Sequence, residues 1–369
     1  CCLATGGYTA VSENPIGSDP WYMLTADLNL DGIPDLATVN RGDSTVSVLI
    51  GNGTDGRGDG TFEAADTFST GSTPYGIAAA DLDADSLPDL VTANNAGNSV
   101  SVHWGQGGGA FGERQDISFA PVTANPVQVV IADFDSNGIP DLATANWGDD
   151  SIAILLGDGS EGQGNRDFNG PVFYSVGAAG VVPRALTTAD FDSDGILDLA
   201  VGNWSGGRVS VLYGGGSGGR GDGTFGSVAR FEAGNSEGNI AHGDFNADGI
   251  LDLAVAAMND GVVNILLGDG SDGRGDGTFL SRTAYPTGST PVSVRVVDMQ
   301  ADGILDLVVA EWGTNKVSVL KGNGSNGRGD GTFGARSPHP VGSYPSAAVV
   351  LESTGDGIPD VAACNYGPD

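Results

Sequence analysis

The chain has 369 residues, of which 47 are acidic and 15 are basic, so its formal net charge at pH 7 is −32. This charge argues against binding to nucleic acid or to anionic membrane surfaces. The sequence contains no run of 18 apolar residues, and it therefore predicts no membrane-spanning helix. No signal peptide is visible, which is compatible with a chain that begins after the removal of one.

A nine-residue acidic pattern recurs along the chain. Its fullest copy, Asp190–Asp198, has carboxylates at positions 1, 3, 5 and 9 and a glycine at position 6. Alternating oxygens from one short loop, with a glycine for the sharp turn, are how a chain builds a Ca²⁺ cage. The first residues of successive copies are 54, 52, 57, 54, 54 and 54 residues apart, a period that indicates an array, a solenoid or a propeller. The seven copies span residues 27–35, 81–89, 133–141, 190–198, 244–252, 298–306 and 352–360.

Each repeat predicts the same strands in the same order. In the first repeat an apolar run leads into loop 27–35, a second run follows at 35–39, and a third run alternates at 44–50. A glycine-rich hairpin and the pair Thr61-Phe62 then lead into a fourth, more polar run. Short valine-rich runs of period two are typical of strands, and no stretch has sustained helical periodicity.

Seven repeats of four strands each predict an all-β fold, with residues 1–369 forming one seven-bladed β-propeller of four-stranded antiparallel blades. A linear β-solenoid is the alternative, but solenoids of calcium repeats have much shorter periods. Segment 347–364 supplies two strands of the last blade, and segment 8–12 resembles a fourth strand. We therefore expect the last blade to be shared between the two termini. Its third strand is expected to be absent, either because this blade has three strands or because the chain has been shortened.

Three cysteines lie near the two ends of the chain, as Cys1, Cys2 and Cys364. A disulfide between Cys364 and Cys1 or Cys2 would staple the ring where it closes, and on the chain-entropy model it would contribute about 4–5 kcal/mol. The alternatives are that the cysteines are reduced or that Cys1 carries a lipid.

The repeated pattern Asp-x-[Asp/Asn]-x-[Asp/Asn]-Gly-x-x-Asp-Leu, followed by Gly-Asp-Gly-Thr-Phe, resembles the FG-GAP/VCBS repeat family. That family includes the N-terminal propeller of integrin α subunits, bacterial integrin-like propellers and a fungal seven-bladed lectin. The resemblance covers essentially the whole chain. It implies a propeller with calcium in the loop between the first two strands of each blade, and it implies adhesion or ligand binding and not catalysis.

On this resemblance we expect six to seven structural Ca²⁺ ions, each held by side chains at positions 1, 3, 5 and 9 and by the carbonyl at position 7. Solvated acidic turns are the alternative. Ser86 replaces the usual glycine and must adopt a positive φ, Gln300 replaces a carboxylate, and the last loop departs most, with Glu352 and Thr354. The expected ligands are Asp27, Asn29, Asp31, Ile33, Asp35, Asp81, Asp83, Asp85, Leu87, Asp89, Asp133, Asp135, Asn137, Ile139, Asp141, Asp190, Asp192, Asp194, Ile196, Asp198, Asp244, Asn246, Asp248, Ile250, Asp252, Asp298, Gln300, Asp302, Ile304, Asp306, Asp356 and Asp360.

The tripeptide Arg-Gly-Asp, which cell-surface integrins bind, occurs in four hairpins and once more at residues 41–43. Turn geometry by itself calls for glycine and aspartate in such hairpins. We therefore expect the arginines mainly to brace each hairpin against an acidic loop of the same or an adjacent blade, and integrin recognition is the alternative. The hairpin residues are Arg57, Gly58, Asp59, Arg220, Gly221, Asp222, Arg274, Gly275, Asp276, Arg328, Gly329 and Asp330.

Aromatic residues follow the second strand of several repeats, as Trp147, Trp204 and Trp312. An aromatic ring beside an amide or a carboxylate is what a sugar site uses, so these are candidate ligand-binding residues. Trp21, Tyr22 and Tyr75 are expected on the same face. The alternative is that the rings wedge between blades.

Catalytic signals are weak, because the three histidines do not repeat and no nucleophile–base set is suggested. The sequence thus predicts a protein that is not an enzyme. We expect a monomeric, extracellular or cell-surface propeller that is stabilised by calcium, resembles the integrin α domain and binds an unidentified protein or glycan. A multivalent carbohydrate-binding lectin is the first alternative, and a purely structural domain is the second.

Overall fold

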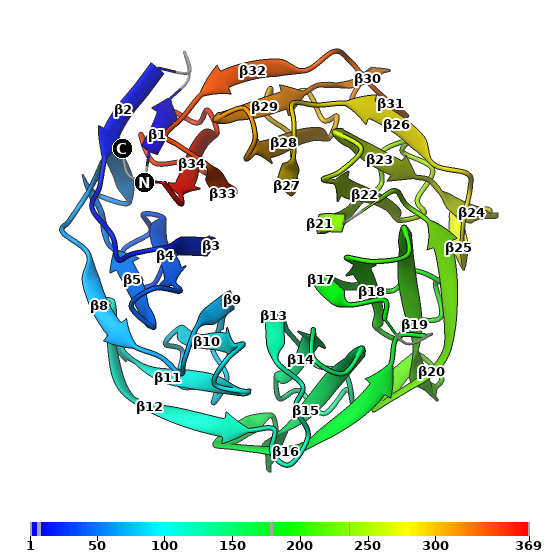
Figure 1. Cartoon of the computed structure of the whole chain (residues 1–369), viewed down its shortest axis with the longest axis horizontal. Coiled ribbons are helices and arrows are strands. Elements are labelled where there is room, and N and C mark those ends of the chain that lie inside the picture. The colour runs from blue at the N-terminus through cyan, green and yellow to red at the C-terminus, as the bar shows by residue number, and fades with distance from the viewer. Residues whose placement is uncertain (1, 6–8, 178–179, 236, 368–369) are drawn as a thin grey trace.

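The computed structural model describes residues 2–5, 9–177, 180–235 and 237–367. Figure 1 shows antiparallel sheets arranged as a ring around a central axis, with the two ends of the chain close together. The predicted all-β propeller with four-stranded antiparallel blades is confirmed. The part of the chain described contains no helix that is long and apolar enough to cross a membrane.

Strands at corresponding places in the repeats have corresponding bounds. The strands nearest the axis are β3 (Pro20–Ala26), β9 (Pro74–Ala80), β13 (Pro126–Ala132), β17 (Pro183–Ala189), β21 (Glu237–Gly243), β27 (Pro291–Val297) and β33 (Pro345–Leu351). The second strands are β4 (Asp35–Asn40), β10 (Asp89–Asn94), β14 (Asp141–Asn146), β18 (Asp198–Asn203), β22 (Asp252–Ala257), β28 (Asp306–Glu311) and β34 (Asp360–Asn365).

The outer strands vary more in length. The third strands are β5 (Thr45–Leu49), β11 (Ser99–Gly107), β15 (Ser151–Ser160), β19 (Arg208–Ser217), β23 (Val262–Leu266), β29 (Lys316–Leu320) and β1 (Cys2–Thr5). The fourth strands are β8 (Asp66–Ser69), β12 (Ala110–Ser118), β16 (Gln163–Ser175), β20 (Arg220–Glu232), β26 (Thr283–Pro286), β32 (Ser337–Pro340) and β2 (Thr9–Glu13). Three hairpins form separate ribbons, namely β6 (Gly51–Thr54) with β7 (Arg57–Phe62), β24 (Gly268–Ser271) with β25 (Arg274–Phe279), and β30 (Gly322–Ser325) with β31 (Arg328–Phe333).

The ring closes through a sheet that both ends of the chain build, in the order β2-β1-β34-β33. The other six four-stranded sheets each take strands from one continuous segment. The predicted sharing between termini is therefore confirmed, whereas the expectation of a missing third strand is wrong. Residues 2–5 supply that strand, with Leu3 opposite Ala362 and Ala4 opposite Val361. This strand is too short to show alternation, and only its partner β34 identifies it.

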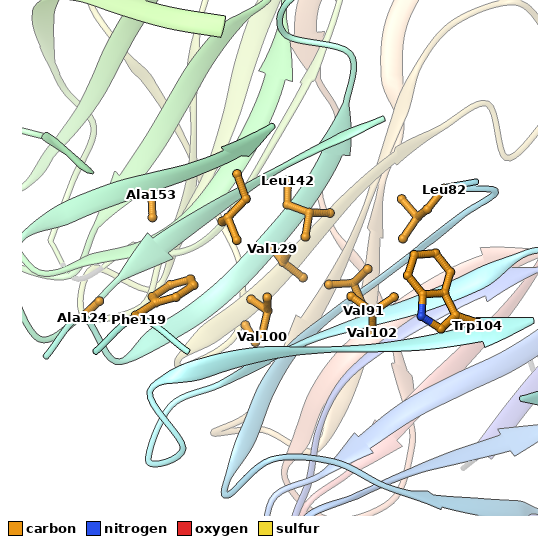
Figure 2. Close-up of a cluster of buried hydrophobic side chains, with 12 residues drawn as sticks. Leu82, Val91, Val100, Val102, Trp104, Phe119, Ala124, Val129, Leu142 and Ala153 are labelled. Atoms are coloured by element: carbon orange, nitrogen blue, oxygen red, sulfur yellow. The ribbon is translucent and has the colours of Figure 1, made fainter. Parts of the chain in front are cut away.

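The hydrophobic core lies between neighbouring sheets. Every residue of each second strand is buried, because both faces of that strand are covered by adjacent blades. Figure 2 shows one such layer, in which Val91 and Val102 of one blade pack towards Leu142 of the next. Blade stacking of this kind fixes the positions of the loops at both ends of the strands.

Cys364 lies at the ring closure. Cys364 carries a free, buried thiol whose sulfur lies 3.3 Å from Oγ of Ser346 and 3.6 Å from Oγ1 of Thr38. Burial raises the pKa of this thiol. A disulfide from Cys364 to Cys1 or Cys2, and a lipid on Cys1, concern side chains that lie outside those described, so they stay predictions.

Candidate functional site

The acidic loops share one internal hydrogen-bond pattern. In loop 27–35, Oδ1 of Asp27 accepts from the amide of Asp31 (3.0 Å), and Oδ2 accepts from the amide of Gly32 (2.8 Å). Oδ1 of Asn29 also accepts from the amide of Asp31 (3.0 Å), while Oδ1 of Asp31 accepts from the amide of Ile33 (2.8 Å). The backbone thus uses Oδ1 at positions 3 and 5, and Nδ2 of Asn29 donates to the remaining oxygen, Oδ2 of Asp31 (2.9 Å). Where both positions are aspartate, as in loop 190–198, the same backbone bonds to Oδ1 leave the two Oδ2 atoms for a cation.

Carboxylate oxygens converge in three of these loops to within 4.8 Å of one another. The groups are Asp81, Asp83 and Asp85; Asp133, Asp135 and Asp141; and Asp190, Asp192 and Asp194. Hard oxygens gathered at this spacing fit Ca²⁺. The turn behind them requires a positive φ at position 6, which is 87° for Gly195 and, as expected, 70° for Ser86.

The ninth residue of each loop is the most buried of the acidic set, and it braces the loop. Asp198 is 1 % exposed. Its Oδ2 accepts from the amide of Phe191 (2.9 Å), and its Oδ1 accepts from the amide of Gly214 (2.8 Å). Burial raises the pKa of Asp198 to about 7, against the lowering effect of these two amides. The position-nine carboxylate therefore joins the loop to the start of the hairpin of its own blade.

Two of the loops that depart from the repeated sequence, 298–306 and 352–360, have side-chain contacts that differ from those of the other loops. Gln300 donates its side-chain amide to Oδ2 of Asp306. In the last loop Oε1 of Glu352 accepts from the amide of Asp356 (3.0 Å), and Oγ of Ser353 donates to Asp360 (2.7 Å). Metal ligation by Gln300, Asp356 and Asp360, like that by the expected ligands of the other loops, stays a prediction.

The Arg-Gly-Asp hairpins dock on the acidic loop of the preceding blade mainly through their glycines. The amide of Gly60 donates to the carbonyl of Ser353 (2.8 Å), and a Cβ on Gly58 would overlap that same carbonyl. The same docking places Gly221 against Phe134, Gly275 against Phe191 and Gly329 against Phe245. This contact explains the central glycine of every copy.

The aspartate of each tripeptide closes its own turn. Oδ1 of Asp59 accepts from the amide (2.9 Å) and the hydroxyl (2.6 Å) of Thr61, and these bonds lower the pKa of Asp59. Asp222, Asp276 and Asp330 bond to the following threonine in the same way. Of the four arginines, Arg328 reaches the neighbouring loop, where it donates to the carbonyl of Ala247 (3.0 Å). The contact with the adjacent blade is thus made mainly by the glycine, whereas the aspartate stabilises the turn of its own hairpin.

The aromatic residues gather around the axis on the opposite face. We call the cluster of Trp21, Tyr75, Trp147, Trp204, Trp312 and Tyr366 the aromatic mouth. The ring of Trp21 lies 5.6 Å from that of Tyr75, 5.7 Å from that of Trp312 and 6.1 Å from that of Tyr366. Tyr75 is in turn 6.1 Å from Trp147. Trp21 thus contacts rings from several blades. Trp21, Tyr75 and Trp312 also pack against the hydrophobic cores between blades, so the alternative in which the rings wedge between blades stays open.

Two arginines lie on these rings. The guanidinium of Arg41 is 4.4 Å from the centre of Trp21 and 4.2 Å from that of Tyr75. Arg184 is 4.4 Å from Trp204 and 5.7 Å from Trp21, and burial together with Arg41 lowers the pKa of Arg184 to about 10. Arg41 begins the fifth Arg-Gly-Asp sequence, and this contact directs it towards the axis and away from the hairpin edge.

A polar layer separates the mouth from the channel along the axis. Tyr22 accepts hydrogen bonds from Gln128 (3.2 Å) and Asn239 (3.1 Å), and Arg295 lies 5.2 Å from its ring. Burial raises the pKa of Tyr22, but the charge of Arg295 and these bonds outweigh it, so the net shift is downwards. Beneath this layer is a channel of about 480 Å³, in which Thr187 and His242 are 2.8 Å apart.

Sequence reasoning missed Arg41 and Arg184 as part of this site, and also the polar layer. A usable signal exists, because six of the axial strands begin with proline and the next residue faces the mouth. Aligning the repeats on that proline places Trp21, Tyr75 and Arg184 at one position, together with Val127, Val292 and Ser346.

The fold and the acidic loops define a β-propeller built from repeats with one potential cation loop each. Residues 27–92, 81–144, 133–201, 190–255 and 244–309 match the FG-GAP-like repeat. The chain belongs to the FG-GAP-like repeat family. No curated protein matches the chain.

Solved structures of similar shape include proteins with different activities. A protein of Bacteroides fragilis named as a 6-phosphogluconolactonase has a TM-score of 0.67 at 19 % identity, over 93 % of this chain and 90 % of its own. The Pseudomonas aeruginosa periplasmic gluconolactonase PpgL scores 0.56 at 18 % identity, over 88 % and 97 %. An Agrocybe aegerita lectin that recognises non-reducing terminal N-acetylglucosamine scores 0.55 at 19 % identity, over 94 % and 86 %.

At these identities the likeness establishes the fold alone. The prediction that the chain is not an enzyme is nevertheless contradicted, because propellers of this shape include two proteins named as lactonases. The prediction rested on the small number of histidines and the missing nucleophile set. A propeller collects its axial side chains from strands far apart in sequence, so a search for local motifs cannot exclude catalysis.

Proposed function

We propose that the chain is a calcium-stabilised, extracellular binding propeller whose ligand occupies the aromatic mouth. The observation that carries this proposal is the pair Arg41 and Arg184, stacked on Trp21, Tyr75 and Trp204. Within the described residues neither arginine has a carboxylate within 4.0 Å, although the chain carries a net charge of −32. Two guanidinium groups without an acidic partner, set among apolar rings, suit an anionic ligand.

We infer that the ligand is a carbohydrate with an acidic group, in keeping with a lectin. Aromatic rings offer flat apolar surface to a sugar, and a guanidinium binds a carboxylate through two parallel hydrogen bonds. The cavity beside Arg184 is about 30 Å³, which is room for a small group and not for a sugar ring. The acidic group would enter this cavity, and the sugar would lie over Trp147, which is 38 % exposed.

We also propose that Ca²⁺ and the Arg-Gly-Asp hairpins stabilise the fold. Ca²⁺ in the acidic loops would neutralise carboxylates that otherwise repel one another, and millimolar extracellular calcium would keep weak loops loaded. The closing sheet would act as a seventh blade. The Arg-Gly-Asp hairpins would be structural, since their glycine and aspartate are used in docking and turn closure.

A glycan array tests the proposal, with acidic and neutral sugars and with calcium or chelator. We expect binding to acidic glycans, a loss of at least tenfold in Arg184→Met, and no loss in Arg208→Met, which removes an exposed arginine paired with Glu232 (2.6 Å) on an outer strand. Binding to neutral glycans alone, or to a protein partner alone, would refute the ligand class. The array should be paired with an assay of sugar-lactone hydrolysis, because turnover lost in Arg184→Met would assign the mouth to catalysis.

A further inference from the structure

Within the described residues, the acidic loop 81–89 differs from the others in that an arginine forms ion pairs with its carboxylates. Arg166, on β16 of the next blade, donates from Nε to Oδ2 of Asp83 and from Nη2 to Oδ2 of Asp85 (3.2 Å). Its guanidinium also lies 5.1 Å from the centre of the Trp104 ring. The Asp83 side chain is only 6 % exposed, whereas the Arg166 side chain is 48 % exposed, so the ion pair is shielded from water on the side of the loop.

The atoms that Arg166 contacts are those expected to bind an ion. Oδ1 of Asp83 accepts from the amide of Asp85 (3.2 Å), and Oδ1 of Asp85 accepts from the amide of Leu87 (2.9 Å). As in loop 190–198, the backbone thus occupies the Oδ1 atoms and leaves the Oδ2 atoms for a cation. In loop 81–89 both of those Oδ2 atoms are already bonded to the guanidinium.

The hairpin sequence explains how the arginine comes to this place. Arg166 stands where the Arg-Gly-Asp hairpins have their last glycine, namely Gly60, Gly223, Gly277 and Gly331. Those glycines have φ between 74° and 80°, and Arg166 keeps a similar φ of 68°. The position faces the third residue of the preceding loop, because a Cβ on Gly223 would lie 3.3 Å from Cβ of Asp135, and one on Gly331 would lie 3.2 Å from Cβ of Asn246.

Loop 81–89 also departs from the repeated sequence at its sixth position. Ser86 replaces the position-six glycine and adopts a φ of 70°, a conformation that is strained for a residue with a side chain. Arg166 bears a similar strain. Ser86 directly follows Asp85, to which Arg166 donates, so the two non-glycine residues at positive φ lie on the two sides of one contact.

We propose that the guanidinium of Arg166 replaces the Ca²⁺ ion of loop 81–89, so that this loop is closed by an internal cation and does not bind calcium. This inference rests on the proposed calcium sites in the other loops. It makes the contact between the blade of β9–β12 and the blade of β13–β16 independent of the calcium concentration, whereas the other hairpin contacts depend on loaded loops.

The test counts bound calcium by native mass spectrometry and by metal analysis of dialysed protein. Arg166→Gly, which restores the residue of the other hairpins, and Arg166→Gln, which removes only the charge, should each bind one more ion than the wild type. Arg166→Lys and the control Arg208→Gln should bind the wild-type number. Tb³⁺ gives a local readout, because Trp104 packs with Leu82 of this loop, and tryptophan-sensitised emission should increase in the glycine and glutamine variants.

Equal, non-zero counts in the wild type and both neutral variants would overturn the proposal and leave the other calcium sites standing. Zero counts in every protein would overturn both this proposal and the calcium part of the proposed function. A gain of one ion in either neutral variant supports it, so a variant that fails to fold does not remove the test.

Discussion

Asp198 and Gly214 are 16 residues apart in sequence, and the amide of Gly214 donates a hydrogen bond of 2.8 Å to Oδ1 of Asp198. The same bond joins Asp35 to Gly51 (2.8 Å) and Asp141 to Gly157 (2.7 Å). It connects the end of the acidic loop to the start of the hairpin in one blade. The hairpin then docks on the loop of the preceding blade, so these bonds link the blades around the ring.

Replacement of Asp198 by Asn should therefore destabilise the protein. An amide side chain has one oxygen, so either the Gly214 amide or the Phe191 amide loses its buried acceptor, at a cost of about 1–3 kcal/mol. Urea unfolding in saturating calcium measures this change. Glu113→Gln, an exposed substitution, is the control and should stay within about 0.5 kcal/mol of the wild type. Equal stability of the two variants would show that the brace is unimportant.

Chelation should lower the melting temperature markedly. Without the ions, the carboxylates that converge within 4.8 Å in loops such as 190–198 repel one another. Calorimetry with EDTA, followed by addition of excess calcium, checks both the loss and its reversal. A melting temperature that does not change in EDTA would rule out structural calcium.

Gly58→Ala should be far more harmful than Arg57→Ala. The added methyl group would overlap the carbonyl of Ser353, and a backbone carbonyl in a packed loop cannot move aside, so we expect a loss of about 1–3 kcal/mol. Gly226→Ala is the control, because its nearest new contact is an ordinary 3.8 Å from the Tyr213 carbonyl. Thermal unfolding compares the three variants. Cell attachment reduced by Arg57→Ala in a stable protein would instead revive integrin recognition.

A buried ion pair offers another test. Glu311 has 0 % side-chain exposure, and Nη1 of Arg336 donates to its two oxygens at 2.9 and 2.7 Å. Arg336→Met would leave an unpaired buried carboxylate, and we expect a loss of about 3–5 kcal/mol. The double variant Glu311→Asn with Arg336→Met should recover most of it, because other blades have Asn at this position, as at Asn146. Failure of the double variant to recover would contradict this account.

His103 should make stability depend on pH. Nε2 lies 2.9 Å from the Ser69 carbonyl, and burial, with a smaller effect of Arg114, lowers the pKa of His103 below 6.5, against the opposing effects of Ser69 and Asp116. A lowered folded-state pKa means that the unfolded chain binds the proton more readily. Stability is therefore complete above about pH 6.5 and is lost as the pH falls towards the folded-state value. Melting temperatures between pH 7.5 and 5.5, in saturating calcium, should fall less in His103→Gln than in the wild type. Parallel curves would show that His103 does not titrate in this range.

Much of the fold could be predicted from the sequence because it rests on local signals. The spacing of the loops, the alternation in runs such as residues 44–50 and the turn glycines each act over a few residues. The residues of the acidic loops could be predicted for the same reason, since one nonapeptide supplies all of its side chains. The third strand of the closing sheet escaped prediction because its four residues acquire a partner only when the ring closes.

The aromatic mouth could be predicted only in part. The position after the second strand predicts Trp147, Trp204 and Trp312. It does not predict Arg41, which stands in the sequence as part of a tripeptide, or Arg184. Each arginine stacks on rings from other blades, and such contacts leave no pattern in the nearby sequence.

The sequence by itself determined the repeat, the blade and the acidic loop of this protein, because these depend on side chains close together along the chain. The tertiary structure alone decided which hairpin meets which loop, and it brought Arg166 of one blade onto Asp83 of another, 83 residues away. It also decided the chemistry of the axis, where one residue from each of several blades faces a common space. Ring closure creates that space, and no single repeat contains it.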